Sequence, residues 1–427
     1  MEVLISTDSS VESKTSLNLW NPLTGTRLAS FRGPPAAPSS LAFIRDEGFA
    51  VVEMGKPFIH FWQYGTPTQT SRRILCSGKP GPMCISPDGN FLAVAVEEKI
   101  SIWQAATGRI VTVINSAHYR PVTALKFNDD GTYLISGAQD GMVLAWQFLV
   151  LVSGVSSVPF HSWSDHTLAI TGIHVGMGGR KAAVFTVGQD RSLKIYSLIN
   201  GNLMLSVGFP MPLTYVVADA AESAVYAGGA DGSIYQMKLG SPPRSIEHHV
   251  ATESVTDFIF RKHNHSITAL AISADGYHLA SGDESGTIHI WDLYSRQAVK
   301  SIGNSKTRIT NLIFWIGNPD GARSGKKPTI VFPEVPKLIE SNEDERQDKE
   351  KLVAVWNRFE QPCETDDIHY HRGVKRPVGS LGACAEINEL KMRLTKCELV
   401  NQKLHEFYVD QVLCNNTNNI GNKKRKT

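Results

Sequence analysis

The stretch HYRPVTALKFNDDGTYLISGAQDGMVLAWQ, residues 118–147, contains three mainly apolar runs that are separated by two short polar turns. The run VTALKF alternates apolar and polar side chains, and the turns NDDG and QDG both end in Asp-Gly. Such runs between turns of Asn, Asp and Gly are typical of short antiparallel strands. Asp-Gly suits a tight hairpin because both residues tolerate a positive φ angle. The stretch therefore predicts three consecutive antiparallel strands.

The same pattern recurs along most of the chain. Clear copies occupy residues 81–104, 168–197, 212–238 and 266–292, and two degenerate copies end in LWN and HFWQ. The residues that mark the end of the third run in each copy are Trp20, Trp62, Trp103, Trp146, Tyr196, Gln236 and Trp291. A repeat of about 40–45 residues, with longer excursions, fits the four-stranded blades of a β-propeller. Seven markers predict about seven blades.

These copies resemble WD repeats over residues 1–315. The predicted fold is therefore all-β: a WD-repeat β-propeller of about seven blades, followed by a flexible linker and a C-terminal coiled-coil helix. Residues 308–315, RITNLIFW, look like an additional inner strand, whereas the first copy, MEVLISTD, has no such strand before it. We expect residues 308–315 to pair with the first blade, because an open ring would leave sheet edges free to pair with other chains.

WD blades commonly contain a buried hydrogen-bonded set of a His, a Ser or Thr, an Asp and a Trp. Buried polar groups need such partners. Two neighbouring blades fit this set, with His118, Ser136, Asp140 and Trp146 in one and His166, Thr186, Asp190 and Tyr196 in the next. The last blade has His263, Ser281 and Trp291 at the matching positions. Because Ser285 stands where the Asp is expected, we predict that the network of this blade is incomplete.

A Ser, a His and an Asp also form the catalytic triad of many hydrolases. Here the trio recurs at the blade spacing, and no G-x-S-x-G motif is present. We therefore interpret it as structural, and we interpret further acidic residues as turn residues: Asp88, Asp129, Asp130, Asp231 and Asp275. The Gly-rich segment HVGMGGR, residues 174–180, lies in a hairpin position and does not match a phosphate-binding loop. No catalytic residue and no cofactor is predicted.

Two histidines, His369 and His371, lie close to Cys363 and to two aspartates in the sequence. This spacing matches no structural zinc pattern, so a solvated loop is our first interpretation and a metal site the alternative. The six cysteines form no CxxC pair, which favours reduced thiols in an intracellular protein. The net charge of +2 gives no general reason to expect a nucleic acid or a membrane as the main partner. We leave open whether RNA is contacted directly.

The start of the chain shows no basic segment followed by an apolar core, so no signal peptide is expected. Residues 141–160 carry no charge and approach the length of a membrane span, about 20 residues. They include two glycines, a proline and several polar side chains, and their first half belongs to the repeat. A buried strand followed by an apolar loop is therefore favoured over a membrane helix.

After residue 315 the repeat pattern ends, and residues 316–382 are rich in Pro, Gly and charge, which predicts an extended or disordered linker. The linker contains one apolar island, residues 329–339, which either packs on the propeller or docks on a partner. The residues that would make such a partner contact are Phe332, Pro333, Val335 and Leu338.

Residues 383–414 change to a helical pattern with a heptad seam. The seam consists of Ile387, Leu390, Leu394, Cys397, Asn401, Leu404 and Tyr408. A helix of about three heptads needs a partner, because most helical stability comes from the burial of its apolar face. We expect a homodimer, with packing on another subunit or on the propeller as alternatives. The basic tail, residues 415–427, contains KKRK, which resembles a minimal nuclear-localisation cluster.

The whole chain resembles the WD-repeat protein eighteen family, the propeller subunit of the Rix-type ribosome-maturation complex. The resemblance rests on MEVLISTDSS at the start, HTLAITGIHVGMGG in the middle and YAGGADGSIYQM in the sixth copy, together with the C-terminal helix. It implies a non-enzymatic scaffold in the nucleolus and nucleoplasm. The implied partners are Rix-type and testis-expressed scaffold subunits, a large AAA remodelling ATPase and pre-ribosomal particles. The implied process is maturation of the large ribosomal subunit precursor, including rRNA spacer processing.

The rival interpretation is a substrate receptor of a cullin ubiquitin ligase, which often carries a WDxR box at the end of a blade. The WD dipeptide at residues 291–292 is followed by Leu293 and Tyr294, so the Arg of that box is missing. This departure favours the scaffold over the receptor.

Overall fold

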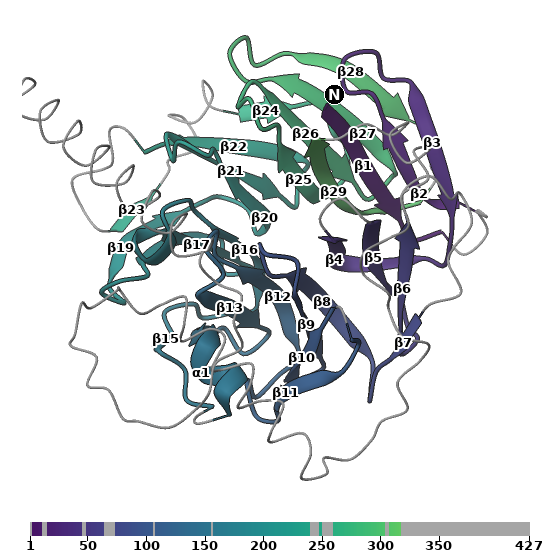
Figure 1. Cartoon of the computed structure of the whole chain (residues 1–427). Coiled ribbons are helices and arrows are strands. Elements are labelled where there is room, and N and C mark those ends of the chain that lie inside the picture. Colours follow the sequence, from purple (N-terminus) through teal and green to yellow (C-terminus); the bar gives the residue numbers. More distant parts are fainter. Residues whose placement is uncertain are drawn as a thin grey trace, which may run out of the picture. The chain divides into compact units, whose positions relative to one another are not determined.

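The computed structural model describes residues 2–10, 15–44, 48–63, 73–105, 107–154, 157–239, 247–249, 259–303 and 307–316. These residues form a seven-bladed β-propeller, in which the four successive strands of each blade pair antiparallel and the blades are arranged around a common axis (Figure 1). The innermost strands of neighbouring blades contact one another in turn around the ring. The predicted fold class and blade number are confirmed for the described part of the chain.

The blades are numbered along the chain, and the strands of each blade follow one another from the inside of the ring outward. Blade 1 contains β29 (Ile309–Ile316), β1 (Glu2–Asp8), β2 (Thr15–Trp20) and β3 (Arg27–Arg32). Blade 2 contains β4 (Ala36–Ile44), β5 (Gly48–Glu53), β6 (Phe58–Gln63) and β7 (Arg73–Leu75). Blade 3 contains β8 (Pro80–Ile85), β9 (Phe91–Val96), β10 (Lys99–Gln104) and β11 (Ile110–Ile114). Blade 4 contains β12 (Val122–Phe127), β13 (Tyr133–Ala138), β14 (Val143–Gln147) and β15 (His161–Trp163).

Blade 5 contains β16 (Ile170–Val175), β17 (Ala183–Gly188), β18 (Ser192–Ser197) and β19 (Leu203–Gly208). A fifth strand, β23 (Glu247–His249), comes from the connection that follows the third strand of blade 6 and pairs in parallel with β19. Blade 6 contains β20 (Leu213–Ala218), β21 (Ala224–Gly229), β22 (Ser233–Lys238) and β24 (Ile259–Arg261). Blade 7 contains β25 (Ile267–Ile272), β26 (His278–Asp283), β27 (Thr287–Asp292) and β28 (Ala298–Gly303).

The hydrophobic core is divided into seven clusters, and each is shared by two neighbouring blades. The aromatic residue that marks a repeat packs against the preceding blade. Trp146 of blade 4, for example, lies in one cluster with Phe91 and Ile102 of blade 3, and Trp62 of blade 2 stacks on Phe49 beside the apolar residues of blade 1. The marker residues therefore recur in the sequence because they pack between neighbouring blades, where the apolar side chains are buried.

The chain closes the ring by pairing its last described strand with its first. Strand β29 pairs antiparallel with β1, from Glu2 opposite Ile316 to Asp8 opposite Ile309, and Figure 1 shows these two strands side by side. The expected pairing of residues 308–315 with the first blade is confirmed. Blade 1 is thereby assembled from two segments that are separated by nearly the whole propeller sequence.

The buried side-chain amide of Asn311 adds hydrogen bonds that stabilise this closure. Asn311 on β29 is 6% exposed, and its Nδ2 donates to Thr7 Oγ1 at 2.8 Å and to the carbonyl oxygen of Ala37 at 2.9 Å. Its Oδ1 accepts from the backbone N–H of Ser40 at 2.9 Å. Because Ala37 and Ser40 belong to blade 2, this one side chain joins both strands of the closure to the next blade.

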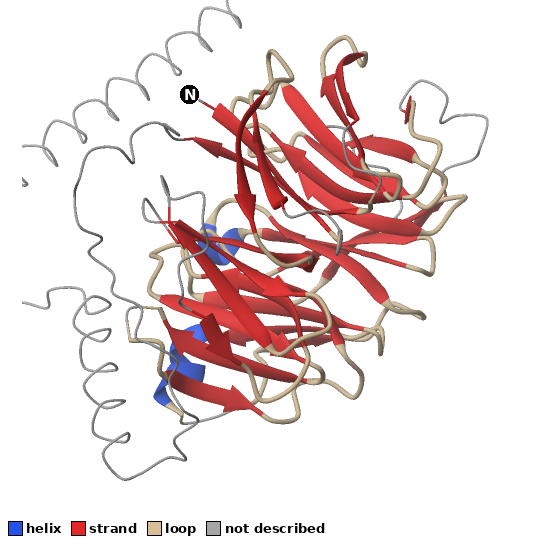
Figure 2. Cartoon of the chain, turned by 90° about the vertical axis from the view of Figure 1, so that its right-hand side faces the viewer, coloured by secondary structure: helices blue, strands red, loops and turns tan. Residues whose placement is uncertain are grey.

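The uncharged segment 141–160 forms the end of blade 4 and a short helix. Strand β14 is followed by α1 (Phe148–Ser153), which is shown in blue in Figure 2. The helix buries Phe148, Leu151 and Val152 in the cluster between blades 3 and 4. No helix in the described part of the chain has the length and apolar character needed to cross a membrane.

Replacement of Asn311 by Ala is expected to destabilise the ring by about 1–3 kcal/mol, because it leaves the buried N–H of Ser40 without its acceptor. Urea unfolding followed by tryptophan fluorescence measures this change. The exposed Asn202→Ala serves as the control and should change stability by less than about 0.5 kcal/mol. Equal stability of the two variants would refute the role of Asn311 in closure.

Candidate functional site

The polar network expected in blade 4 is present. His118 Nδ1 lies 3.2 Å from Asp140 Oδ2, and His118 Nε2 lies 2.8 Å from Ser136 Oγ. Trp146 Nε1 donates to the same Ser136 oxygen at 2.9 Å. One proton arrangement satisfies every atom: the indole donates to the hydroxyl, the hydroxyl donates to Nε2, and Nδ1–H donates to the carboxylate. Because Ser136 is fully buried and its oxygen accepts the indole N–H, a substrate has no access to it as a nucleophile.

Blade 5 repeats the network with one change. His166 joins Asp190 and Thr186 at 2.8 Å each. Tyr196 takes the position of the tryptophan, and its ring stacks on Trp163 at 4.7 Å between centroids. Burial raises the pKa of Tyr196, and the neighbouring carboxylate of Asp165 adds to this effect. Burial opposes the charge on Asp190, but hydrogen bonds from His166 and Ser192 outweigh it and lower the pKa of this carboxyl to about 2.

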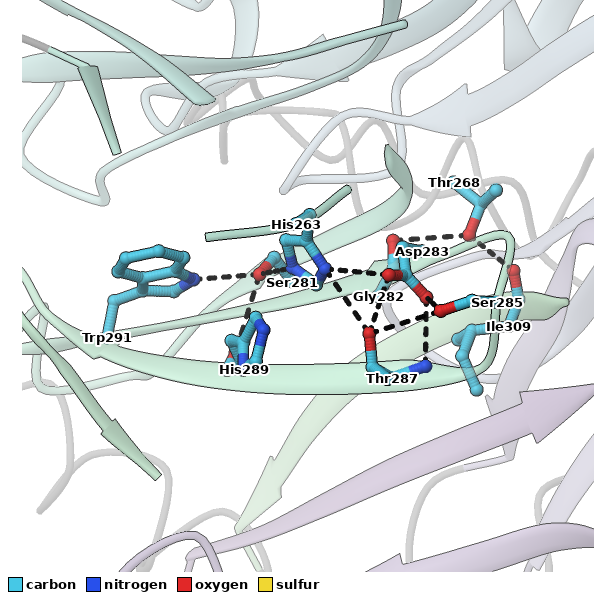
Figure 3. A network of polar contacts seen from close by, with 10 residues as sticks. All are labelled: His263, Thr268, Ser281, Gly282, Asp283, Ser285, Thr287, His289, Trp291 and Ile309. Carbon is cyan, nitrogen blue, oxygen red and sulfur yellow. Dashed lines mark hydrogen bonds and ion pairs between the residues drawn. The ribbon is translucent and has the colours of Figure 1, made fainter. Parts of the chain in front are cut away.

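The prediction of an incomplete network in blade 7 is wrong. His263 Nδ1 lies 3.0 Å from Asp283 Oδ2, while Nε2 lies 2.6 Å from Ser281 Oγ and Trp291 donates to that oxygen at 2.8 Å. Figure 3 shows this chain of contacts. The carboxylate comes from the end of β26, two residues before Ser285, whose hydroxyl donates to Asp283 at 2.8 Å. The aspartate is therefore supplied from the strand and not from the turn.

The same strand position carries an acid in two other blades, which was not expected from the sequence. In blade 2 Glu53 ends β5 and lies 2.8 Å from His60 Nε2, with both residues 6% exposed. In blade 1 Asp8 ends β1 and is 3% exposed. Burial raises the pKa of Asp8 to about 6, although the N–H of Ser10 opposes this. An acidic residue at the end of the second strand of a copy was the signal that could have revealed these sites.

A second repeated feature connects the blades at the innermost strands. The threonine in the second position of an inner strand donates to the first residue of the next inner strand in four successive blades. These bonds run from Thr123 to Ile170, Thr171 to Leu213, Thr214 to Ile267 and Thr268 to Ile309, at 2.5–2.8 Å. In the sequence these threonines form the recurring pairs VT, IT, LT and IT, which could have been used to predict the feature.

Each turn aspartate accepts hydrogen bonds within its own or a neighbouring turn. Asp88 and Asp275 accept from the serine two residues earlier, Asp130 accepts from Thr132, and Asp231 accepts from Ser233 and Tyr235. Asp129 reaches blade 5, where it accepts from the N–H groups of Gly178 and Gly179 at 2.9 and 2.7 Å.

The Gly-rich segment 174–180 contains the end of β16 and most of the connection to β17, which includes a short 3-10 helix, η1 (Gly179–Lys181). A Cβ atom on Gly179 would lie 2.6 Å from the Asp130 carboxylate, and one on Gly176 would overlap the side chain of Glu222 in blade 6. The glycines are therefore required because carboxylates of two neighbouring blades pack directly on this hairpin.

The described cysteines, Cys76 and Cys84, are buried thiols. Burial raises the pKa of both to about 12, so neither is a reactive thiolate near neutral pH. Within the described ranges, no group of three metal-ligating side chains is found. The predictions for His369 and His371, for residues 329–339, for the heptad seam and for the basic tail concern residues outside the described ranges.

Comparison with known proteins agrees with this architecture. The family model "WD domain, G-beta repeat" matches residues 108–147 and 253–292, in and around blades 4 and 7. The mouse protein "WD repeat-containing protein 18" is 32% identical over 420 residues, which cover 95% of this chain and 97% of the relative. The human protein of the same name is also 32% identical and covers the same shares. The chain belongs to the WD repeat-containing protein 18 family. The Caenorhabditis briggsae relative "Pre-rRNA-processing protein pro-1" is 26% identical over 89% of this chain and 71% of its own length.

Asp283→Ala is expected to destabilise the protein by about 2–4 kcal/mol, since it leaves the Nδ1–H of His263 with only the hydroxyl oxygen of Thr287, at 3.5 Å, as a distant acceptor. Ser285→Ala should cost less than about 1 kcal/mol, because Asp283 keeps its other donors. Urea unfolding of the two variants measures the difference. The reverse order would restore Ser285 as the acceptor of the network.

A second histidine makes blade 7 sensitive to acid. His289 is 7% exposed, and its ring lies tilted against that of His263, with 4.4 Å between the ring centroids. Burial, and the proximity of His263, lower the pKa of His289 to about 4. Because the pKa is lower in the folded state than in the unfolded state, the contribution of His289 is complete above about pH 6.5 and declines as the pH falls toward 4.

We expect His289 alone to account for about 3 kcal/mol of stability lost between pH 6.5 and pH 4. His289→Leu should therefore flatten the acid limb of the stability curve, whereas the exposed His265→Leu should leave it unchanged. Urea unfolding at a series of pH values tests this. Parallel acid limbs for wild type and His289→Leu would contradict the prediction.

Proposed function

We propose that this chain is a non-enzymatic scaffold subunit of a nuclear complex that matures the precursor of the large ribosomal subunit. The observation that carries the proposal is the family membership over 95% of the chain, together with the relative named as a pre-rRNA-processing protein. The proposed process is rRNA spacer processing with recruitment of a remodelling ATPase. The proposed location is the nucleolus and nucleoplasm.

The geometry of the propeller supports a binding role. In blades 4, 5 and 7, the polar residues that resemble a catalytic triad form hydrogen bonds with other buried side chains. What the described residues offer to other molecules is their exposed loops and turns on a rigid closed ring. The proposed partners are the Rix-type and testis-expressed scaffold subunits, the large AAA remodelling ATPase and pre-ribosomal particles.

The C-terminal heptad seam supplies the second part of the proposal. A helix with apolar residues at heptad spacing pairs with another helix, and Asn401 at an a-type position favours one register. A homodimer would present two propellers, which raises avidity for a particle with two docking sites without any new contact.

Tagged full-length protein, expressed with an untagged copy, should capture ribosome-maturation subunits and the untagged copy from nuclear extract. A twin lacking residues 383–427 should retain the propeller contacts but lose the copy, since it lacks the seam. Mass spectrometry at moderate salt reads both results. Capture of cullin adaptors without pre-ribosomal proteins would replace the scaffold by a ubiquitin-ligase receptor, and capture of the copy by the twin would refute the helix as the dimer contact.

A further inference from the structure

The boundary between blades 4 and 5 contains a groove. It lies on the face of the propeller that carries the turns between first and second strands, which we call the turn face, and it borders helix α1 (Figure 1). Its volume is about 310 Å³, at the lower end of the range of ligand pockets, about 300–1,000 Å³. Blade 4 supplies most of the lining, and Arg180 supplies the blade 5 side.

The blade 4 side of the groove is aromatic, and its rings are held by packing. Phe148 lines the groove from α1, is buried, and packs edge-on against Phe91 and Phe127 at 5.0 and 5.1 Å between centroids. Tyr133 also lines it, and its ring lies 5.4 Å from that of Phe160. Phe160 is 45% exposed, so it continues the aromatic surface outside the groove. A ligand meets rings that lose little freedom when it binds.

Two side chains place hydrogen-bond donors beside these rings. Gln147 lines the groove, is partly exposed and does not cap α1, which follows it directly. Arg180 is exposed, and a guanidinium carries five N–H groups. An amide and a guanidinium both donate to carbonyl oxygens, which every peptide segment displays.

Charge does not select the ligand of the groove. The described strands and turns that border it carry as many cations as carboxylates. Two of the carboxylates, on the turn of blade 4, already accept hydrogen bonds from the N–H groups of Gly178 and Gly179 and from Thr132. The charged side chains are Arg109, Lys126, Arg180, Lys181, Asp88, Asp129, Asp130 and Glu222. Rings and donors without net charge favour an apolar segment that presents free carbonyl oxygens.

A segment in the polyproline II conformation has this character. Its backbone carbonyls have no internal partner, and every third side chain faces the same side. Segments of the pattern P-x-x-P dock in aromatic-lined grooves in this way. After residue 316 this chain contains one such sequence, Pro-Glu-Val-Pro at residues 333–336. It lies in the apolar island 329–339, in which the charges of Glu334 and Lys337 cancel.

Strand β29 ends on the face that carries the groove. Its last residue, Ile316, lies opposite Glu2, whose carboxylate accepts the N–H of Ala274 in the first turn of blade 7. Seven inner strands about 10 Å apart form a ring about 23 Å across, and the groove lies about 10 Å farther out, so a direct line measures about 33 Å. Residues 317–333 provide up to about 56 Å of chain. The tether therefore reaches the groove without full extension.

We propose that residues 329–339 dock in this groove of their own propeller. Pro333 and Pro336 face the same side and pack on the aromatic rings. The carbonyl oxygens between them accept hydrogen bonds from Gln147 and Arg180.

The tether decides between this occupant and a separate protein. A short flexible linker gives a tethered segment an effective concentration in the millimolar range. The segment therefore fills the groove even with modest intrinsic affinity, and a partner with the same motif has to displace it. The inference concerns two parts of one chain and does not depend on the proposed scaffold function.

The first test replaces Phe160 of the full-length protein by a photo-crosslinking phenylalanine analogue. Irradiation of the purified protein should join residue 160 to residues 329–339, as read by mass spectrometry of the peptides, and the product should keep the mass of a single chain on a denaturing gel. The same analogue at residue 119 is the control. Tyr119 is 86% exposed on the loop before β12, at the other end of blade 4, and should give no crosslink to 329–339.

The second test measures competition with a labelled peptide of residues 329–339. Full-length protein with Pro333→Ala and Pro336→Ala frees its groove, so it should bind the peptide at least about tenfold more tightly than wild type. Adding Phe160→Ala to this variant should weaken binding at least about tenfold, and adding Gln147→Ala should weaken it without removing a ring. Tyr294→Ala, on an exposed turn of blade 7, should leave binding unchanged. Melting temperatures identify any variant that loses binding because it unfolds.

Four results would overturn the docking. These are a crosslink from residue 160 to other residues only, a crosslinked product with the mass of two chains, equal peptide affinity of wild type and the proline variant, and equal affinity with and without Phe160→Ala. Irradiation in nuclear extract adds a further decision. Replacement of the 329–339 crosslink by a peptide of another protein would assign the groove to a partner and refute the tethered segment as its occupant.

Discussion

The pairing of β29 with β1 is the constraint on which the propeller depends. Each blade buries its apolar side chains against its two neighbours, so no blade has a core of its own. If β1 lost its inner partner, blades 1 and 7 would expose the cluster that contains Trp20 and Leu312. The closing strand therefore couples both ends of the described chain to the same cooperative unit, and Asn311 extends that coupling to blade 2.

The regular part of this fold was predictable because packing between blades requires a large side chain at one position of every repeat. The markers Trp20, Trp62 and Trp103 survive even where the turns have diverged, since each fills the space beside the preceding blade. Closure was predictable for a related reason. The last copy is followed by an extra inner strand, and the first copy has no inner strand before it, so pairing the two is the one arrangement that leaves no free sheet edge.

The polar network of blade 7 was not predictable from turn spacing. A hydrogen bond requires a carboxylate oxygen at a certain point in space, and aspartates at different sequence positions can place an oxygen there. A carboxylate reaches His263 from the end of β26 as well as from the following turn, and Ser285 then serves as a donor to it. The pair of Glu53 and His60 was missed for the same reason. Both sites became visible only when the register of neighbouring strands placed the side chains together.

The repeat departs from its pattern where blades 5 and 6 meet. At the turn of blade 4, glycine is obligatory because a Cβ would lie 2.7 Å from the carbonyl oxygen of His166. Blade 6 has Phe209 where blade 5 has His166, and the turn of blade 5 that faces Phe209 carries Arg191, with a φ angle of +63°, where blade 4 has that glycine. With Phe209 in place of the histidine, blade 6 also lacks the His–Asp bond that blades 4, 5 and 7 retain, so the departure from the repeat removes one of the buried polar contacts that stabilise the other blades.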